Sequence, residues 1–349
     1  MDDDQWLPKC TFPDALVRPV RIDPEGLTGP TEGQARRGKW IRTSHGLHVP
    51  AGTDRARVEQ RILEQSARLG DTGAVTGWAS LRVAGGGFFD GLGRDGKAEL
   101  PVALVAPGHL RPLAGCTVSR DRLPVDEIEL RHGIRCTTVT RALFDEMRRT
   151  GDLRDAVVAM DMAAAAELTS IRRMTTYVMG RSRARGSQLC LRALALATEF
   201  SRSPAESRMR LLWILDAGLP RPLCNQPIFG RDGRLLGIAD LFDPIAGVVG
   251  EYDGAAHRGR ERRRHDVGRE DAFRRHRLEF FRVVSGDDDA TVVDRMLTTR
   301  ARAAFLPQAD RPWSLLRPGD EGRAPEPTLD DRLDVRDWVA DTRADAEES

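Results

Sequence analysis

The sequence predicts an α/β protein in which mixed sheets are flanked by helices. Two patterns predict this class. Apolar residues recur at helical spacing from Val139 to Ala166, whereas residues 235–242 and 248–254 are apolar runs of strand length joined by a turn. A sequence typical of a helix N-terminus, beginning at Ser203, precedes the two strands. We therefore expect the second half of the chain to combine a helix and a strand hairpin in one α/β domain.

The composition indicates a multi-domain protein that does not cross a membrane. A chain of 349 residues is longer than a domain with a single hydrophobic core usually is. No apolar run approaches the roughly 18 residues that a membrane-spanning helix needs. The acidic start lacks the features of a secretory signal, so we expect a cytoplasmic protein. The five cysteines form no CxxC pair, which indicates reduced thiols. The acidic, proline-rich residues 306–349 predict a flexible tail.

Residues 1–54 predict a helix followed by a hairpin. The helix is expected from Thr31 to Arg37, and alternating apolar residues between Trp40 and Val49 predict the hairpin. A winged-helix DNA-binding segment has this order of elements, but so do many other small α/β segments. Both interpretations stay open at this point.

Residues 55–195 predict an α+β middle domain. A helix is expected from Arg55 to about Leu69, and a β-rich passage follows between residues 101 and 123. The Gly-rich stretch at 77–96 has no GxxxxGK[ST] pattern, so it predicts turns and no cofactor-binding phosphate loop. The helical block from Val139 to Ala166 predicts packed scaffold.

A helix start opens the third segment, residues 196–305. Ser203 occupies an N-cap position, Pro204 the first helical position and Glu206 the position three residues after the cap. The helix is expected to run to about Ala217. This spacing explains Glu206 as a capping residue, and that interpretation stays open beside any role in a site.

Three carboxylates fall in the predicted hairpin. Asp240 lies near the end of the first strand, while Glu251 and Asp253 are two apart in the second and share a face. Buried carboxylates are costly unless a cation compensates them, and Mg²⁺ or Mn²⁺ prefers such oxygen ligands. The pattern therefore predicts a divalent metal site. The alternatives are that Asp240 pairs with an arginine and that the other two acids mark an ordinary strand exit.

Five motifs follow one another in the order typical of a known superfamily. They are SPAES, GIADL, VVGEYDGAAH, HDVGRED and LEFFRVVSGDD. The segment 203–286 thus resembles the PD-(D/E)XK nuclease superfamily, most closely its very-short-patch-repair-like (Vsr-like) branch. The resemblance implies a restriction-endonuclease-like domain whose metal site is formed by Glu206, Asp240 and Glu251.

One position departs from the superfamily pattern. Asp253 stands where many members carry lysine, and no lysine follows Lys97. His257 or an arginine of the next segment is the candidate for proton transfer or phosphate neutralisation. We therefore expect Asp253 and His257 to act as auxiliary catalytic groups. The missing lysine favours a non-catalytic role, whereas the three metal-site acids favour catalysis.

A run rich in arginine follows the hairpin. Cations beside an acidic metal site suit a phosphate backbone, although a solvated helix face is the alternative. Arg269 and Arg282 also match arginine positions of the superfamily. The expected nucleic-acid-binding residues are Arg258, Arg262, Arg263, Arg269 and Arg282.

The first two hundred residues resemble, more distantly, the antitoxins of abortive-infection type IV toxin–antitoxin systems. The segments GLTGPTEGQARRGKWIRTSHGLHVP and IRCTTVTRALFDEMRRTGDLRDAVVAMDMA carry this resemblance, which implies DNA binding and a partner protein. We therefore expect a metal-dependent DNA endonuclease. The alternative is a non-catalytic DNA-binding regulator or antitoxin of a defence system. The sequence does not indicate an oligomeric state.

Overall fold

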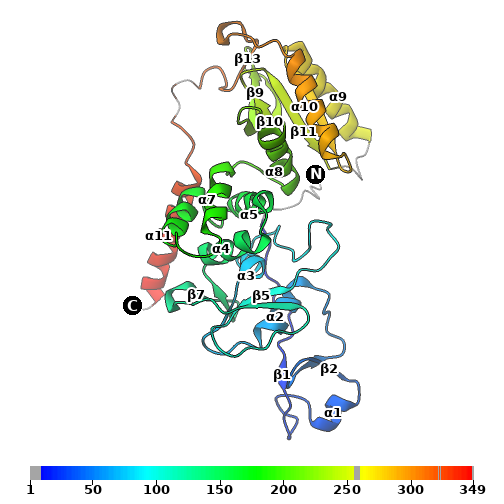
Figure 1. The fold of residues 1–349 in the computed structure, drawn as a ribbon, viewed down its shortest axis with the longest axis vertical. Coiled ribbons are helices and arrows are strands. Elements are labelled where there is room, and N and C mark those ends of the chain that lie inside the picture. The colour runs from blue at the N-terminus through cyan, green and yellow to red at the C-terminus, as the bar shows by residue number, and fades with distance from the viewer. Residues whose placement is uncertain (1–8, 255–259, 321, 323, 348–349) are drawn as a thin grey trace. The chain divides into compact units, whose positions relative to one another are not determined.

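The computed structural model describes most of the chain. The described ranges are residues 9–254, 260–320, 322 and 324–347, with backbone alone for 260–267, 341 and 343–347. Over these ranges the chain is an α/β protein with three mixed or antiparallel sheets flanked by helices, as predicted (Figure 1). No helix in the described ranges is long and apolar enough to cross a membrane.

Two compact units divide the chain. Unit 1 comprises Met1–Ala159 and Ala166–Leu191, and unit 2 comprises Met160–Ala165 and Arg192–Ser349. Two helices contribute residues to both units, namely α5 (Leu153–Ala165) and α7 (Ser187–Leu196). Each unit is described by itself below.

Unit 1 begins with the predicted helix and hairpin. The elements are β1 (Val20–Arg21), α1 (Glu32–Arg36), β2 (Trp40–Ser44) and β3 (Leu47–Pro50). The sheet has the order β1-β3-β2. Thr31 caps α1 by accepting from the Gln34 N–H, and the Gln34 side chain accepts from the Thr31 N–H in return. The expected order of elements is confirmed here.

The second sheet of unit 1 is mixed and has the order β6-β5-β4-β8-β7. Its strands are β4 (Ala74–Val75), β5 (Val102–Val105), β6 (Cys116–Ser119), β7 (Ile128–Arg131) and β8 (Ile134–Thr137). Strand β5 runs parallel to β6 and antiparallel to β4. The β-rich passage predicted between residues 101 and 123 therefore contains two neighbouring strands.

Two helices pack on this sheet, α2 (Val58–Ser66) and α3 (Gly77–Val83). Helix α4 (Val139–Thr150) packs on α3, α6 (Ile171–Met179) packs on α4, and α5 follows α4 along the chain. The Gly-rich stretch was predicted to form turns, yet it begins with α3. Trp78 and Leu81 are buried on that helix, so tertiary packing overrides the weak local preference. The turn lies at Gly85, where φ is +97°.

Unit 2 contains a mixed sheet of order β12-β11-β10-β9-β13. The strands are β9 (Leu223–Gly230), β10 (Leu235–Asp243), β11 (Val248–Asp253), β12 (Glu279–Val284) and β13 (Trp313–Ser314). The predicted hairpin is β10–β11, which is antiparallel, whereas β11 and β12 are parallel. The helices are α8 (Pro204–Leu211), α9 (Arg260–Arg275), α10 (Asp289–Arg302) and α11 (Leu329–Glu347).

Apolar clusters cover both faces of this sheet. On one face Trp213, just after α8, stacks on Phe281 at a ring distance of 6.0 Å, and Met296 of α10 joins them. On the other face Phe273 of α9 packs with Phe242.

The chain differs from expectation at two places. The helix starting at Pro204 changes to a π-helical turn after Leu211. The tail was expected to be flexible, but Trp313 is 5% exposed and pairs β13 with β9, and α11 follows. An acidic average composition conceals a few apolar residues, here Leu329 and Leu333, that are buried.

Candidate acidic site in unit 2

Glu206 is bonded to the start of α8 and to strand β9. Its Oε2 accepts from the Arg202 N–H at 2.8 Å and from Asn225 Nδ2 at 2.7 Å, while Ser203 Oγ lies 3.0 Å from Oε1. Ser203 in turn accepts from the Glu206 N–H, as an N-cap residue does. Ser203 therefore caps the helix, but the capping box is incomplete, because the Glu206 carboxylate accepts from the Arg202 N–H and not from the Ser203 N–H. The bonds to Arg202 and Asn225 fix this carboxylate in place.

Asp240 lies where the backbone pairing of β10 with β11 ends. The β10–β11 register pairs Phe242 with Val249 and Leu241 with Gly250. Beyond these pairs the Asp240 side chain accepts from the Tyr252 N–H at 2.9 Å, so the carboxylate bonds directly to the backbone of β11.

The carboxyl group of Asp240 is difficult to ionise. Burial, followed by the negative charge of Glu206, raises its pKa from 3.8 to about 6. The Tyr252 N–H and the charges of Arg269 and Arg202 oppose the increase. In the described ranges Asp240 makes no ion pair, so the alternative in which it pairs with an arginine does not hold there.

Glu251 is buried and contacts α9. Its residue exposure is 6%, and Arg269 Nη2 donates to its Oε2 at 2.7 Å. The parallel register with β12 places Arg282 beside Glu251, and the Arg282 guanidinium lies 5.5 Å from the centre of the Phe280 ring. Arg269 thus acts on both strands, by an ion pair to Glu251 and by its charge on Asp240.

Some predicted site residues are not brought together. Asp253 lies two residues beyond Glu251 and is partly buried. His257 and Arg258 lie outside the described residues, as do the side chains of Arg262 and Arg263. In the part of the chain that the structure describes, no group of three or more His, Cys, Asp or Glu side chains could hold a metal ion. The predicted three-acid cluster is therefore not assembled here.

The donor chemistry of Asp240 and Glu251 still fits a hard divalent ion. Both are carboxylates of neighbouring strands, and the pKa of Asp240 is raised by burial and by the charge of Glu206. Mg²⁺ or Mn²⁺ prefers carboxylate oxygens and keeps several waters, so two protein ligands suffice. Glu206 adds a third negative charge near Asp240, although its oxygens are already hydrogen-bonded.

Sequence reasoning missed three contributors to this site. They are Arg202, Asn225 and the Tyr252 N–H. Asn225 has a φ of +49°, a left-handed conformation that asparagine adopts more readily than most residues. Its side chain joins β9 to Glu206 across 19 residues of sequence, a pairing that depends on tertiary structure.

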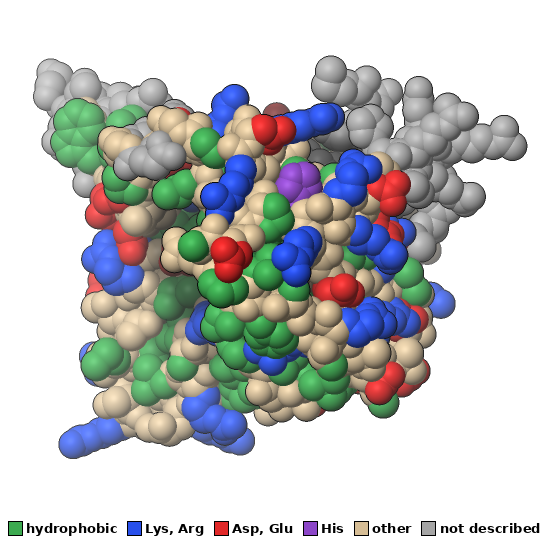
Figure 2. Space-filling model, turned by 90° about the horizontal axis from the view of Figure 1, so that it is seen from above, with side chains coloured by type: hydrophobic (Ala, Val, Ile, Leu, Met, Phe, Trp, Pro, Cys, Tyr) green, Lys and Arg blue, Asp and Glu red, His purple; other side chains and the backbone are tan. Residues whose placement is uncertain are grey.

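The described surface carries mixed charge. Figure 2 shows basic and acidic side chains interspersed with apolar ones over the face seen from above. Comparisons of the chain with protein-family models, with curated proteins and with solved structures gave no match.

Proposed function

We propose that unit 2 is a metal-dependent DNA endonuclease domain of the restriction-endonuclease-like type. One observation carries the proposal. Asp240, a half-buried aspartate whose pKa is raised to about 6, bonds to the backbone of β11, the strand that carries the buried Glu251. Buried carboxylates with perturbed pKa values are characteristic of functional sites.

Each acid has a defined part in this proposal. Asp240 and Glu251 bind the ion, and Glu206, held by Arg202 and Asn225, serves as third ligand or positions a water. A bound Mg²⁺ or Mn²⁺ would supply an activated water and stabilise charge on the phosphate. Asp253 and His257 are the auxiliary groups carried over from the sequence.

Arg269 is well placed to neutralise a phosphate. Its guanidinium contacts Glu251 and lowers the pKa of Asp240, so it lies at the acidic site and carries the positive charge that the superfamily lysine would supply. A planar guanidinium binds phosphate oxygens through two hydrogen bonds, which a lysine cannot do. Arg282, beside Glu251 on the next strand, is the second candidate.

Cleavage of supercoiled, linear and single-stranded DNA by the full-length protein tests the proposal. We expect cleavage with Mg²⁺ or Mn²⁺, none with EDTA, and a loss of at least about a hundredfold in Glu251→Gln, which keeps the side-chain shape. Asp271→Asn, an exposed change on α9, is the matched control and should cleave normally. If the wild type and Glu251→Gln cleave equally, the proposal is refuted.

A non-catalytic DNA-binding regulator or antitoxin is the second candidate function. The helix and hairpin of α1, β2 and β3 support it, because a winged helix has this order of elements. Absence of cleavage together with salt-dependent DNA binding would favour this candidate. Binding that is lost on deletion of residues 1–54 would assign the DNA contact to that segment.

A further inference from the structure

A hollow of about 500 Å³ lies at one end of the mixed sheet of unit 1. Loops that precede β4 and follow β5 and β6 form it, together with residues of β7 and β8. Its lining includes Asp71, Arg120, Arg122, Leu123, Val125 and Arg135. A volume of this size falls in the range of small-molecule sites.

The hollow carries an excess of positive charge. Three arginines line it against the single carboxylate of Asp71, which leaves two positive charges. None of the three makes an ion pair within the described ranges. Arg120 donates to the carbonyl oxygens of Ala106 at 3.0 Å and Leu110 at 2.5 Å, and a neutral carbonyl leaves the charge in place.

Arg122 is the most available of these cations. Its side chain is exposed, and no hydrogen bond of its guanidinium is recorded among described residues. Arg135 donates from Nε to the carbonyl oxygen of Gly73 at 3.2 Å, which leaves its two terminal nitrogen atoms available to a ligand. Two guanidinium groups can therefore turn toward a ligand without breaking an ion pair.

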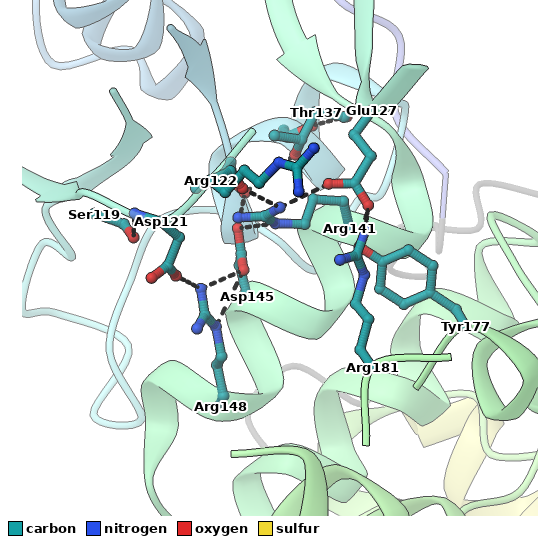
Figure 3. Close-up of polar contacts among 12 residues, drawn as sticks. Ser119, Asp121, Arg122, Glu127, Thr137, Arg141, Asp145, Arg148, Tyr177 and Arg181 are labelled. Carbon is teal, nitrogen blue, oxygen red and sulfur yellow. Dashed lines mark hydrogen bonds and ion pairs between the residues drawn. The ribbon is translucent and has the colours of Figure 1, made fainter. Parts of the chain in front are cut away.

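A buried network holds the wall that carries Arg122. Arg141 donates to the Arg122 carbonyl oxygen at 3.1 Å and to Glu127 at 2.6 Å, and Arg148 pairs with both Asp145 and Asp121 (Figure 3). These contacts fix the backbone on both sides of Arg122. Sites on supported backbone keep their geometry better than sites on free loops.

Most of the other lining residues are apolar. Val125 is 85% exposed, which is unusual for a large aliphatic side chain, and Leu123 and Ile128 lie beside it in the hollow. Such a surface accepts the flat face of a base or another apolar group. A ligand with an anionic end and an apolar end would therefore match both kinds of lining.

We propose that this hollow binds the phosphate of a nucleotide, either free or within a nucleic-acid strand. Guanidinium groups pair with phosphate through parallel charge-assisted hydrogen bonds, and the apolar side chains receive the base. The site belongs to unit 1 and uses none of the acids of unit 2. Binding here goes beyond the proposed nuclease function and does not depend on it.

Calorimetric titration of the full-length protein tests this site, with ADP, inorganic phosphate and a twelve-nucleotide single strand as separate probes. We expect ADP to saturate one site in EDTA, without divalent metal. Arg122→Glu should weaken ADP binding at least tenfold, because it replaces an attractive charge by a repulsive one. Arg135→Gln should weaken it less. Arg94→Glu, an exposed change in the same unit, should leave it within twofold.

The two phosphate sources give different results. If the hollow takes a strand, Arg122→Glu weakens the oligonucleotide as well as ADP; if it takes a free nucleotide, only ADP is affected. The inference is overturned if none of the three probes saturates at millimolar concentration, or if Arg122→Glu binds them as the wild type does. Circular dichroism of each variant verifies that the fold is retained.

Discussion

The buried acids Glu127 and Asp145 of unit 1 differ from the half-buried Asp240 of unit 2 in the charges that surround them. In unit 1, Glu127 and Asp145 are each in contact with Arg141 and with a second arginine (Figure 3). In unit 2, Asp240 has a second carboxylate, Glu206, near it and no ion pair in the described ranges. Burial of an acid therefore does not by itself point to a site, and the neighbouring carboxylate of Glu206 is what distinguishes Asp240 as a candidate.

Asp161 of unit 2 shows what a paired buried acid looks like beside Asp240. Asp161 is fully buried in unit 2 and pairs with Arg210 at 2.6 Å, while Ser207 also donates to it. Burial raises the pKa of this carboxyl group too, although Arg210 opposes it. Asp240 differs because another negative charge, from Glu206, adds to the effect of burial.

The largest effect should come from breaking the balanced network. Arg141→Leu leaves Glu127 and Asp145 buried with less compensation, so we expect a loss of about 3–5 kcal/mol in the free energy of unfolding. Urea denaturation followed by circular dichroism measures it. Arg131→Leu, which breaks a more exposed pair with Glu129, is the control and should cost at most about 1 kcal/mol. Equal losses would mean that burial adds nothing.

Asp240 should make the folded state less stable at neutral pH, whereas the paired acids of unit 1 do not. The pKa of Asp240 rises from 3.8 to about 6 on folding, so the contribution of this group to stability is greatest below pH 3.8 and is lost as the pH rises through 6. Asp240→Asn lacks this loss. We expect the variant to be more stable than wild type at pH 7.5 by up to about 3 kcal/mol, and equal to it near pH 3.5.

Thermal unfolding across this pH range, without divalent metal, gives the comparison for Asp240→Asn. The amide oxygen that this substitution introduces can still accept the hydrogen bond from the Tyr252 N–H, so the backbone contact is kept. Asp271→Asn should follow the wild type at every pH. A variant that is less stable than wild type at pH 7.5 would show that Asp240 is a structural acid like those of unit 1.

A smaller effect is expected at Arg269. Its side chain is 34% exposed, so solvent screens its pair with Glu251, and Arg269→Gln should cost about 1 kcal/mol or less. The same substitution removes the guanidinium group that competes with a metal ion for Glu251 Oε2. We therefore expect Mn²⁺ to bind Arg269→Gln several times more tightly, as measured by calorimetry. Weaker Mn²⁺ binding would indicate that Arg269 orders the site instead of competing for it.

Local features of unit 2 were accessible from sequence, and long-range ones were not. The N-cap at Ser203 and the β10–β11 hairpin follow from spacing within a few residues. The bond from Asn225 to Glu206 does not, because β9 lacks a clear apolar alternation and its pairing is decided by the sheet. The place of Trp313 in the core is equally non-local.

The charge balance of the two units could not be read from sequence either. In a chain in which 31% of residues are charged, most acids have arginines nearby along the sequence. Only the fold decides that Asp145 lies against Arg141 while Asp240 lies near Glu206. The candidate acids of the hairpin were therefore predictable, and the effect of Glu206 on Asp240 was not.

Mn²⁺ binding to the full-length protein at pH 7.5, followed by electron paramagnetic resonance, tests the acidic site of unit 2 most directly. Wild type and the Asp271→Asn control should bind one ion with the same affinity, and Asp240→Asn and Glu251→Gln should each bind it at least tenfold more weakly. If all four proteins bind Mn²⁺ alike, or none binds it at millimolar concentration, Asp240 and Glu251 do not form a metal site.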